Sequence, residues 1–232
     1  MSLRLDWCSH EAAVYAVRRW HYSRRMPRSK LVRIGVWEDD RFCGAILYGL
    51  GAGRAGLLGS PYGLAATEAA ELVRVALAPR RRHPTSKSVA ISLRLLRRQS
   101  PGLKLVVSFA DSGRGHVGTI YQAGGWIHVG VSLQSYIKVR GEIVHPRTLY
   151  DRYGGANGQS IPWLREHVDP RACRVEMAPK LKYLMPFDSA LRKQLEALAL
   201  PFPKHADEAT GVAAGDQPDQ GGSIPTRPLQ IP

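Results

Sequence analysis

Hydrophobic positions in the first fifty residues follow two different patterns. In residues 9–20 they have the spacing of one helix face, and Ser9 is placed to cap that helix. Residues 31–39 and 42–50 are β-like runs, and Asp39 and Asp40 between them are a hairpin turn signal. We therefore expect a helix, a basic loop and then a two-stranded hairpin.

The middle of the chain carries hydrophobic runs that are typical of buried strands. Residues 71–77 and 103–110 form two such runs, and an amphipathic helix is predicted over 86–98 between them. A longer strand follows at 126–139. A helix between two neighbouring strands implies a parallel crossover. The pattern therefore predicts an α/β fold with a mixed sheet flanked by helices.

The pattern changes after residue 145. Short helices are predicted over 147–153 and 160–167, a basic strand-like piece over 174–185, and a last amphipathic helix over 188–200. A helix-turn-helix is imaginable in this part, but the signal for it is weak. The last residues are rich in Gly, Pro, Asp and Gln, and a stretch with so few large apolar side chains is expected to be disordered.

These changes divide the chain into three parts. Residues 1–145 are expected to form the core. Residues 146–203 are expected to form a basic appendage that packs on the core, and residues 204–232 a disordered tail.

Charge favours a polyanionic partner. The 232 residues carry a formal net charge of +14, which points to nucleic acid or an acidic membrane surface. Because the basic residues cluster, we favour nucleic acid, and the alternative is a well-solvated basic enzyme. The sequence shows neither a signal peptide nor a transmembrane run, so no membrane partner is expected.

The three cysteines give no sign of a metal or disulfide framework. Cys8, Cys43 and Cys173 lie far apart and form no CxxC pair. A reducing intracellular compartment is the setting that fits them best.

The loop before the helix at 86–98 is a candidate anion site. It follows a buried strand and leads into a helix N-terminus, whose free N–H groups attract phosphates. The candidate cofactor-binding residues there are Arg80, Arg81, Arg82, Thr85 and Ser86. The alternative is that these arginines form a solvated turn.

Arg74 is a candidate site residue because it lies inside the buried run 71–77. A cation in such a strand needs a partner or a ligand. Glu71 would lie on the opposite face of the strand by strict alternation, so it is not an obvious partner. A structural ion pair is the alternative.

Asp111 ends the buried strand 103–110, where parallel α/β sheets place their ligands. Several glycines follow it, and they allow tight turns and close backbone approach. Tyr121 lies in the short helical segment beyond them. A Tyr in such a segment is more often a core residue, which is the alternative.

A basic loop next to Trp20 and Tyr22 has the mixture expected of a nucleic-acid contact. Arginines there would neutralise phosphates, and an aromatic ring could stack on a displaced base. The candidate DNA-binding residues, in this loop and in the appendage, are Arg24, Arg25, Arg28, Lys30, Arg147, Arg165, Lys180 and Lys182. The alternative is a solvated surface.

Two resemblances sharpen this interpretation. The segment SFADSGRGHVGTIYQAGGWIHVG (108–130) resembles the part of the GNAT acetyltransferase fold in which a Tyr-bearing helix flanks the cofactor and the sheet splays apart. The chain also resembles the phage Mom DNA-modification family over about residues 15–190. The stretches that carry this resemblance are WHYSRRMPRSKLVRIGVWEDDRFCGAILYGLG, ELVRVAL, LRLLRRQSPGLKLVVSFAD, GHVGTIYQAGGWIHVG and IPWLREHVDP…KYLMPFD.

The resemblance to the Mom family implies a transferase that adds a carbamoylmethyl group to adenine N6 in double-stranded DNA and so blocks host restriction. It also implies catalytic roles for His21, Tyr22, Arg74, Asp111 and Tyr121. Iron binding is implied for His21, Asp111 and Tyr121, a set of O and N donors that suits iron.

The resemblance to the GNAT fold implies acetyl-CoA or a related donor, held by its diphosphate on a glycine-rich loop. The equivalent loop here lacks glycine, and Pro84 removes one amide donor, which argues against coenzyme A.

Two alternatives remain open from the sequence: a coenzyme A-dependent N-acetyltransferase acting on a small amine or protein, and a non-catalytic DNA-binding module. The expected setting is the cytoplasm of the bacterial host of a phage or prophage, with a homodimer as one oligomeric state that the sequence allows.

Overall fold

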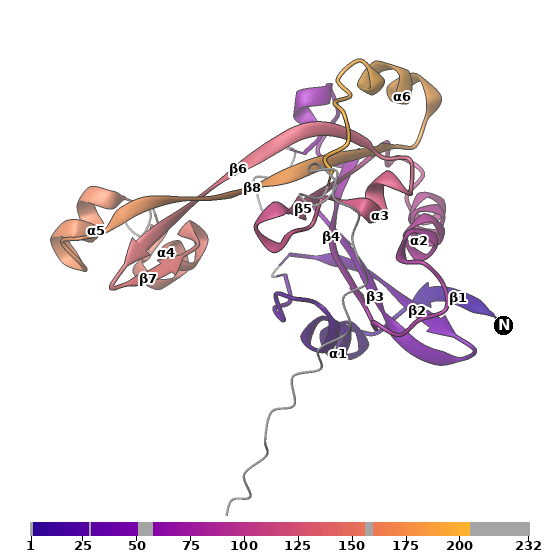
Figure 1. Cartoon of the computed structure of the whole chain (residues 1–232), viewed down its shortest axis with the longest axis horizontal. Coiled ribbons are helices and arrows are strands. Elements are labelled where there is room, and N and C mark those ends of the chain that lie inside the picture. Colours follow the sequence, from indigo (N-terminus) through magenta and orange to yellow (C-terminus); the bar gives the residue numbers. More distant parts are fainter. Residues whose placement is uncertain (1, 28, 51–57, 156–159, 205–232) are drawn as a thin grey trace, which may run out of the picture.

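The computed structural model describes residues 2–27, 29–50, 58–155 and 160–204. Figure 1 shows a compact body with an arm projecting from it. The elements are β1 Leu3–Trp7, α1 His10–Trp20, β2 Leu31–Glu38, β3 Arg41–Gly49, η1 Ser60–Tyr62, β4 Ala69–Leu77, α2 Thr85–Gln99, β5 Leu105–Asp111, η2 Ser112–Arg114, α3 Thr119–Gln122, β6 Ile127–Val139, β7 Glu142–Val144, α4 Pro146–Tyr153, α5 Ile161–His167, β8 Cys173–Pro186 and α6 Ser189–Glu196.

In the described part of the chain, eight strands form one mixed sheet in the order β1-β2-β3-β4-β5-β8-β6-β7. β4 and β5 are parallel and are joined by α2, whereas β2 and β3 form an antiparallel hairpin. The hairpin turns at Asp39 and Asp40, whose φ values of 46° and 61° are those of a tight hairpin turn. These features confirm the predicted α/β fold, its hairpin and its crossover.

The two parallel strands separate after a short paired stretch. β4 pairs with β5 only from Ala69↔Leu105 to Leu72↔Ser108. Beyond that point β4 continues to Leu77 and β5 to Asp111. The sheet is therefore splayed between β4 and β5, as the resemblance to the GNAT fold implied.

Helices cover both faces of the sheet. Ala16 and Val17 of α1 pack with Leu47 of β3, whereas Val89 of α2 belongs to the cluster that contains Ile46, the neighbour of Leu47. Because neighbouring residues of a strand point to opposite faces, α1 and α2 lie on opposite faces of the sheet. α1 begins where predicted, since Ser9 Oγ accepts a hydrogen bond from the Ala12 N–H.

The structure differs from the expected boundary at residue 145. β8 lies between β5 and β6 in the middle of the sheet, and its Tyr183 and Leu184 are fully buried. Residues 173–186, assigned from sequence to the appendage, are therefore part of the core sheet. The sequence pattern also missed β1 and β7, two short strands.

What projects from the body is the stretch between the middle of β6 and the middle of β8, residues 134–155 and 160–177, which we call the arm (Figure 1). The arm has a small core of its own. It consists of Ile137, Val139, Leu149, Leu164 and Ala172. The helices α4 and α5 thus pack on the arm's own strands, whereas β8 and α6 of the predicted appendage pack on the body.

The predicted disordered tail lies outside the described residues from 205 onward. Among the described helices, none has both the length and the apolar character needed to cross a bilayer.

Candidate active site

The opening between β4 and β5 contains a cavity of about 450 Å³. Its walls come from the end of α1, the far half of β4, the end of β5 and residues 115–121. The five residues predicted to be catalytic all line it: His21, Tyr22, Arg74, Asp111 and Tyr121. The fold therefore brings together residues that are up to a hundred positions apart in the sequence.

Tyr22 lies at the mouth of the cavity and joins several of these groups. Its ring stacks on that of His21 with 4.3 Å between centroids. Burial and the nearby Asp111 charge both raise the pKa of Tyr22. Tyr22 is thus a neutral phenol beside the Asp111 carboxylate.

His21 is held by the turn that follows α1. Its Nδ1 accepts a hydrogen bond from the Ser23 N–H at 3.1 Å and lies 2.8 Å from Ser23 Oγ. Burial and the positive charges of Arg74 and His116 lower the pKa of His21 to about 4. The imidazole is therefore neutral at pH 7, the form in which histidine accepts protons or binds metals.

Arg74 reaches the cavity from β4. One of its Nη atoms donates to the Val73 carbonyl at 2.7 Å, and its buried Nε has no hydrogen-bond partner among the described residues. Burial lowers the pKa of Arg74, while Tyr22 and Glu71 oppose that effect. A half-buried guanidinium on a cavity wall is suited to bind an anionic group of a ligand.

Tyr121 forms part of the inner wall. Its hydroxyl lies 2.8 Å from Ser108 Oγ, and its ring packs against Trp126 and Tyr183 at 5.0 Å between centroids. Gly118, with φ +82°, precedes α3, and a Cβ there would lie 2.4 Å from the Tyr183 ring. A glycine is therefore required for α3 to come close enough to place Tyr121.

The donors predicted to bind iron share one cavity, and their chemistry fits that metal in part. His21 and Asp111 offer a neutral imidazole and a carboxylate, but burial raises the pKa of Tyr121 to about 12. Tyr121 would have to lose its proton to bind iron. Among the described residues, His, Cys, Asp and Glu side chains form no cluster of three or more that could hold a metal.

Side chains of the candidate cofactor loop before α2 form hydrogen bonds and an ion pair within the protein. Arg81 and Thr85 line the cavity, yet Arg81 Nη2 donates to Thr85 Oγ1 at 2.7 Å. The Arg82 side chain forms an ion pair with Asp39 at 3.0 Å. Of the other two candidates, Arg80 is exposed and Ser86 lines a separate groove beside Trp126.

The candidate DNA-binding residues are spread over the body and the arm. Lys180 lines the cavity and lies opposite Asp111 in the sheet, and the Lys182 ammonium lies 5.0 Å from the centre of the Tyr62 ring. The remaining described candidates are Arg24, Arg25 and Lys30 in the exposed loop after α1, and Arg147 and Arg165 in the arm helices. Arg28 lies outside the described residues.

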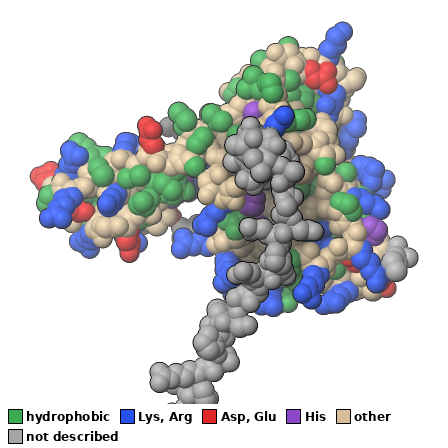
Figure 2. All heavy atoms as spheres, viewed as in Figure 1, with side chains coloured by type: hydrophobic (Ala, Val, Ile, Leu, Met, Phe, Trp, Pro, Cys, Tyr) green, Lys and Arg blue, Asp and Glu red, His purple; other side chains and the backbone are tan. Residues whose placement is uncertain are grey.

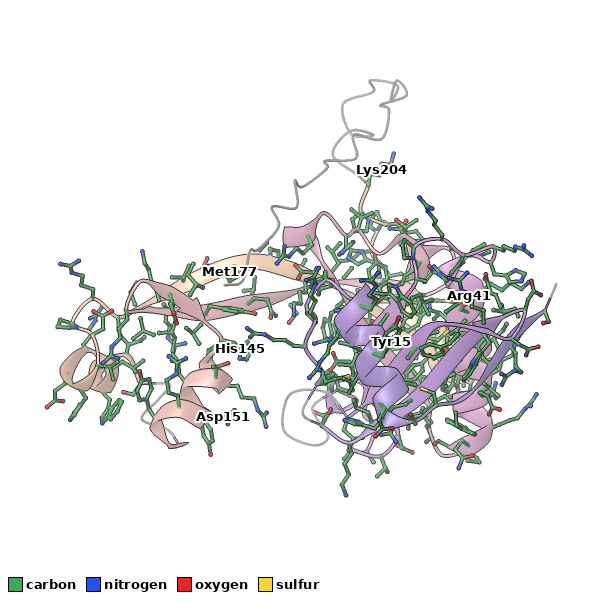
Figure 3. The ribbon with its side chains drawn as sticks, turned by 90° about the horizontal axis from the view of Figure 1, so that it is seen from below. Tyr15, Arg41, His145, Asp151, Met177 and Lys204 are labelled. Atoms are coloured by element: carbon green, nitrogen blue, oxygen red, sulfur yellow. The ribbon has the colours of Figure 1, made fainter. Side chains whose placement is uncertain are left out.

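The visible face of the molecule carries many more basic than acidic side chains, over both the body and the arm (Figure 2). The base of the arm lies close to the cavity. Burial lowers the pKa of His145 in the arm, and the charge of Lys180, which lines the cavity, lowers it further. Figure 3 shows His145 on the side of the arm nearer the body, with Asp151 farther out.

Two residues beside Tyr22 were missed by the sequence interpretation. The His116 ring lies 5.7 Å from the Tyr22 ring, and the Arg114 guanidinium lies 5.8 Å from its centre. Both belong to the glycine-rich segment after Asp111, in which the sequence pattern singled out only the glycines, Asp111 and Tyr121 as candidate site residues. His116 also lines the cavity.

Comparison with known proteins identifies similar chains. A model of the Mom protein family matches residues 2–204. A curated protein named methylcarbamoylase mom, from Escherichia phage Mu, is 26% identical over 210 residues, which cover 87% of this chain and 84% of the relative.

Solved structures that resemble the chain include aminoglycoside acetyltransferase AAC(6')-Ib in complex with coenzyme A and kanamycin. That match has a TM-score of 0.47 and 8% identity, and it covers 83% of this chain and 98% of the other. Another is a protein described as an acetyltransferase of the GNAT family from Desulfovibrio desulfuricans. That match has a TM-score of 0.42 and 13% identity, and it covers 80% of this chain and 99% of the other.

Proposed function

This chain belongs to the Mom protein family, and from that premise we propose that it is a transferase that adds a carbamoylmethyl group to adenine N6 in double-stranded DNA. The modified base would protect phage DNA from restriction inside the bacterial host. The observation that carries the proposal is the cavity between β4 and β5, where Tyr22, Asp111 and Arg74 meet.

The cavity has a size and a rim that suit an everted base. Its volume of about 450 Å³ falls in the ordinary range for small-molecule sites, about 300–1,000 Å³. N6 of a stacked adenine is not accessible to an enzyme, so the base must leave the duplex or be bound unpaired. The half-exposed ring of Tyr22, with His116 beside it, offers a surface on which such a base can stack.

The reaction forms a bond between adenine N6 and the methylene carbon of an electrophilic carbamoylmethyl donor. The bond from that carbon to the donor's leaving group breaks, and N6 loses one proton. The Asp111 carboxylate is the proton acceptor we assign, since it lies on the cavity wall beside Tyr22. Arg74 and Lys180 then neutralise negative charge on the leaving group or on the flanking phosphate.

Iron is a separate proposal, in which Asp111 would bind the metal in place of accepting the N6 proton. His21, Asp111 and Tyr121 are the residues that would hold it. When bound, it would supply a Lewis acid that polarises the transferred group.

The direct test is mass spectrometry of nucleosides from DNA of cells that express the protein. Wild-type protein is expected to yield carbamoylmethyl-adenine, and Asp111→Asn to reduce the yield by about a hundredfold or more, as for loss of a general base. Asp40→Asn, at an exposed turn position that asparagine tolerates, is the matched control and should leave the yield unchanged.

The same experiment separates the alternatives. Unmodified adenine together with retained DNA would favour a non-catalytic DNA-binding module. Unmodified DNA together with an acetylated small amine or protein would favour a coenzyme A-dependent N-acetyltransferase. Either result would contradict the proposed function.

A further inference from the structure

A carboxylate of the protein itself binds the main chain of the loop that leads into α2. Glu38, the last residue of β2, accepts a hydrogen bond from the Arg82 N–H on Oε2 and another from the His83 N–H on Oε1, both at 2.9 Å. The carboxylate thus takes two consecutive backbone donors in a bidentate contact. Main-chain donors before a helix are the groups that ordinarily bind the phosphates of a ligand.

The other donors of this loop are also used. Arg81 Nε donates to the Ala78 carbonyl and Nη2 to Thr85 Oγ1. The Arg82 guanidinium donates to Asp39 at 3.0 Å. Pro84 has no N–H to offer. The Arg82 and His83 amides and the Arg81 and Arg82 side chains are therefore already engaged within the protein, although the loop is rich in arginine.

Glu38 is well suited to hold this position. Partial burial raises its pKa, but the Arg82 and His83 N–H groups and the charges of His83 and Arg81 outweigh that effect and hold the pKa of Glu38 below its ordinary value. The side chain is therefore ionised at neutral pH. Because it belongs to the same chain, a ligand diphosphate must displace it and also overcome its repulsion.

We propose that Glu38 takes the place of a coenzyme A diphosphate, so that this chain takes its transferred group from a donor that lacks a nucleoside-diphosphate handle. The description of that molecule as a group donor rests on the proposed function, whereas the exclusion of coenzyme A rests on the contacts of Glu38 and of the loop before α2. The donor then binds in the cavity itself, which the Arg74 side chain lines.

Isothermal titration calorimetry with coenzyme A, and separately with inorganic pyrophosphate, tests this proposal on the full-length protein. Wild-type protein is expected to bind neither ligand below about millimolar concentration, and Glu38→Ala to bind both about tenfold more tightly or better. Glu38→Gln keeps one acceptor oxygen and should show a smaller gain. Glu142→Ala, at an exposed position of the arm, is the control and should match the wild type.

Micromolar binding of coenzyme A to the wild type would overturn the proposal, whatever the variants do. Equal, weak binding by wild type, Glu38→Ala and Glu38→Gln would overturn the role of Glu38. Thermal unfolding of each variant shows whether the fold is kept, and if Glu38→Ala unfolds, the comparison is made with Glu38→Gln. If the wild type binds coenzyme A and its DNA is modified, this proposal is contradicted but the proposed function is not. If the wild type does not bind coenzyme A and its DNA is unmodified, the proposed function is contradicted but this proposal is not.

Discussion

Arg74 lines the cavity from a strand that is otherwise largely apolar. Its neighbours Leu72 and Ala76 are buried core residues, and its Nε has no partner among the described residues. We expect Arg74→Ala to abolish modification while the free energy of unfolding changes by less than about 1 kcal/mol, because no buried ion pair is broken. Nucleoside mass spectrometry and denaturant unfolding measure the two effects.

Arg33 supplies a matched control for that experiment. It is also a strand arginine with a buried, unpaired Nε, but it does not line the cavity. Arg33→Ala should therefore keep activity. A loss of about 3–5 kcal/mol in Arg74→Ala would instead identify a structural ion pair.

The iron proposal is tested residue by residue through metal content. We expect purified wild-type protein to contain iron and His21→Ala, Asp111→Ala and Tyr121→Phe to lose most of it, since each removes one donor. Tyr15→Phe, on the exposed face of α1, is the control. Equal iron content in all the proteins, or a fully active wild type without iron, would rule the site out.

Two candidate site residues could be singled out from the local sequence, and the structure places both at the cavity wall. Asp111 follows a buried run and Arg74 interrupts one, so the pattern of their immediate neighbours is enough to single both out. Glu38 does not stand out, because it looks like the polar end of a hairpin strand. Its partners are the amides of Arg82 and His83, about forty residues away, and no local pattern connects them.

At the level of elements, the sequence pattern identified those whose hydrophobic period is regular. The hairpin, the crossover helix α2 and the strand β5 have such periods. The position of β8 could not be predicted in this way, because its first half alternates exposed and partly buried residues and only its second half is buried. Which strands it pairs with is decided by contacts far apart in the sequence.

The arm should respond to mutation separately from the body, because it has its own small core. Leu164 of α5 is fully buried there, and replacing such a leucine by alanine costs about 2–5 kcal/mol. We expect Leu164→Ala to raise hydrogen exchange and proteolysis within residues 134–177 while the main thermal transition is kept.

Leu133, at 84% exposure on the neighbouring stretch of β6, gives the control variant Leu133→Ala, which should have no such effect. If Leu164→Ala lowers protection equally in the body and the arm, the two fold as one cooperative unit.

For the whole molecule, the net charge of +14 predicts strongly salt-dependent binding to duplex DNA. Several phosphate contacts from the body and the arm should lower the affinity by orders of magnitude between ~50 and ~200 mM salt. Fluorescence anisotropy with a labelled duplex measures this slope. A nearly flat response would remove the electrostatic basis for a DNA substrate.

The last residues should be dispensable for this behaviour. Residues 206–232 contain too little apolar surface to add to a core. We expect a chain truncated after residue 205 to keep its melting temperature and its modification activity, measured by calorimetry and nucleoside mass spectrometry. A lower melting temperature would show that the tail contributes to the fold.

The place of β8 in the sheet has a consequence for biosynthesis. β8 is the last strand to be synthesised, yet it fills the position between β5 and β6, both of which precede it. Until it emerges from the ribosome, each of those strands has an open edge, and such edges readily pair with other chains. Nascent chains that stop before residue 173 should therefore be unusually dependent on chaperones. Most of the arm is synthesised before β8 can complete the sheet from which the arm projects.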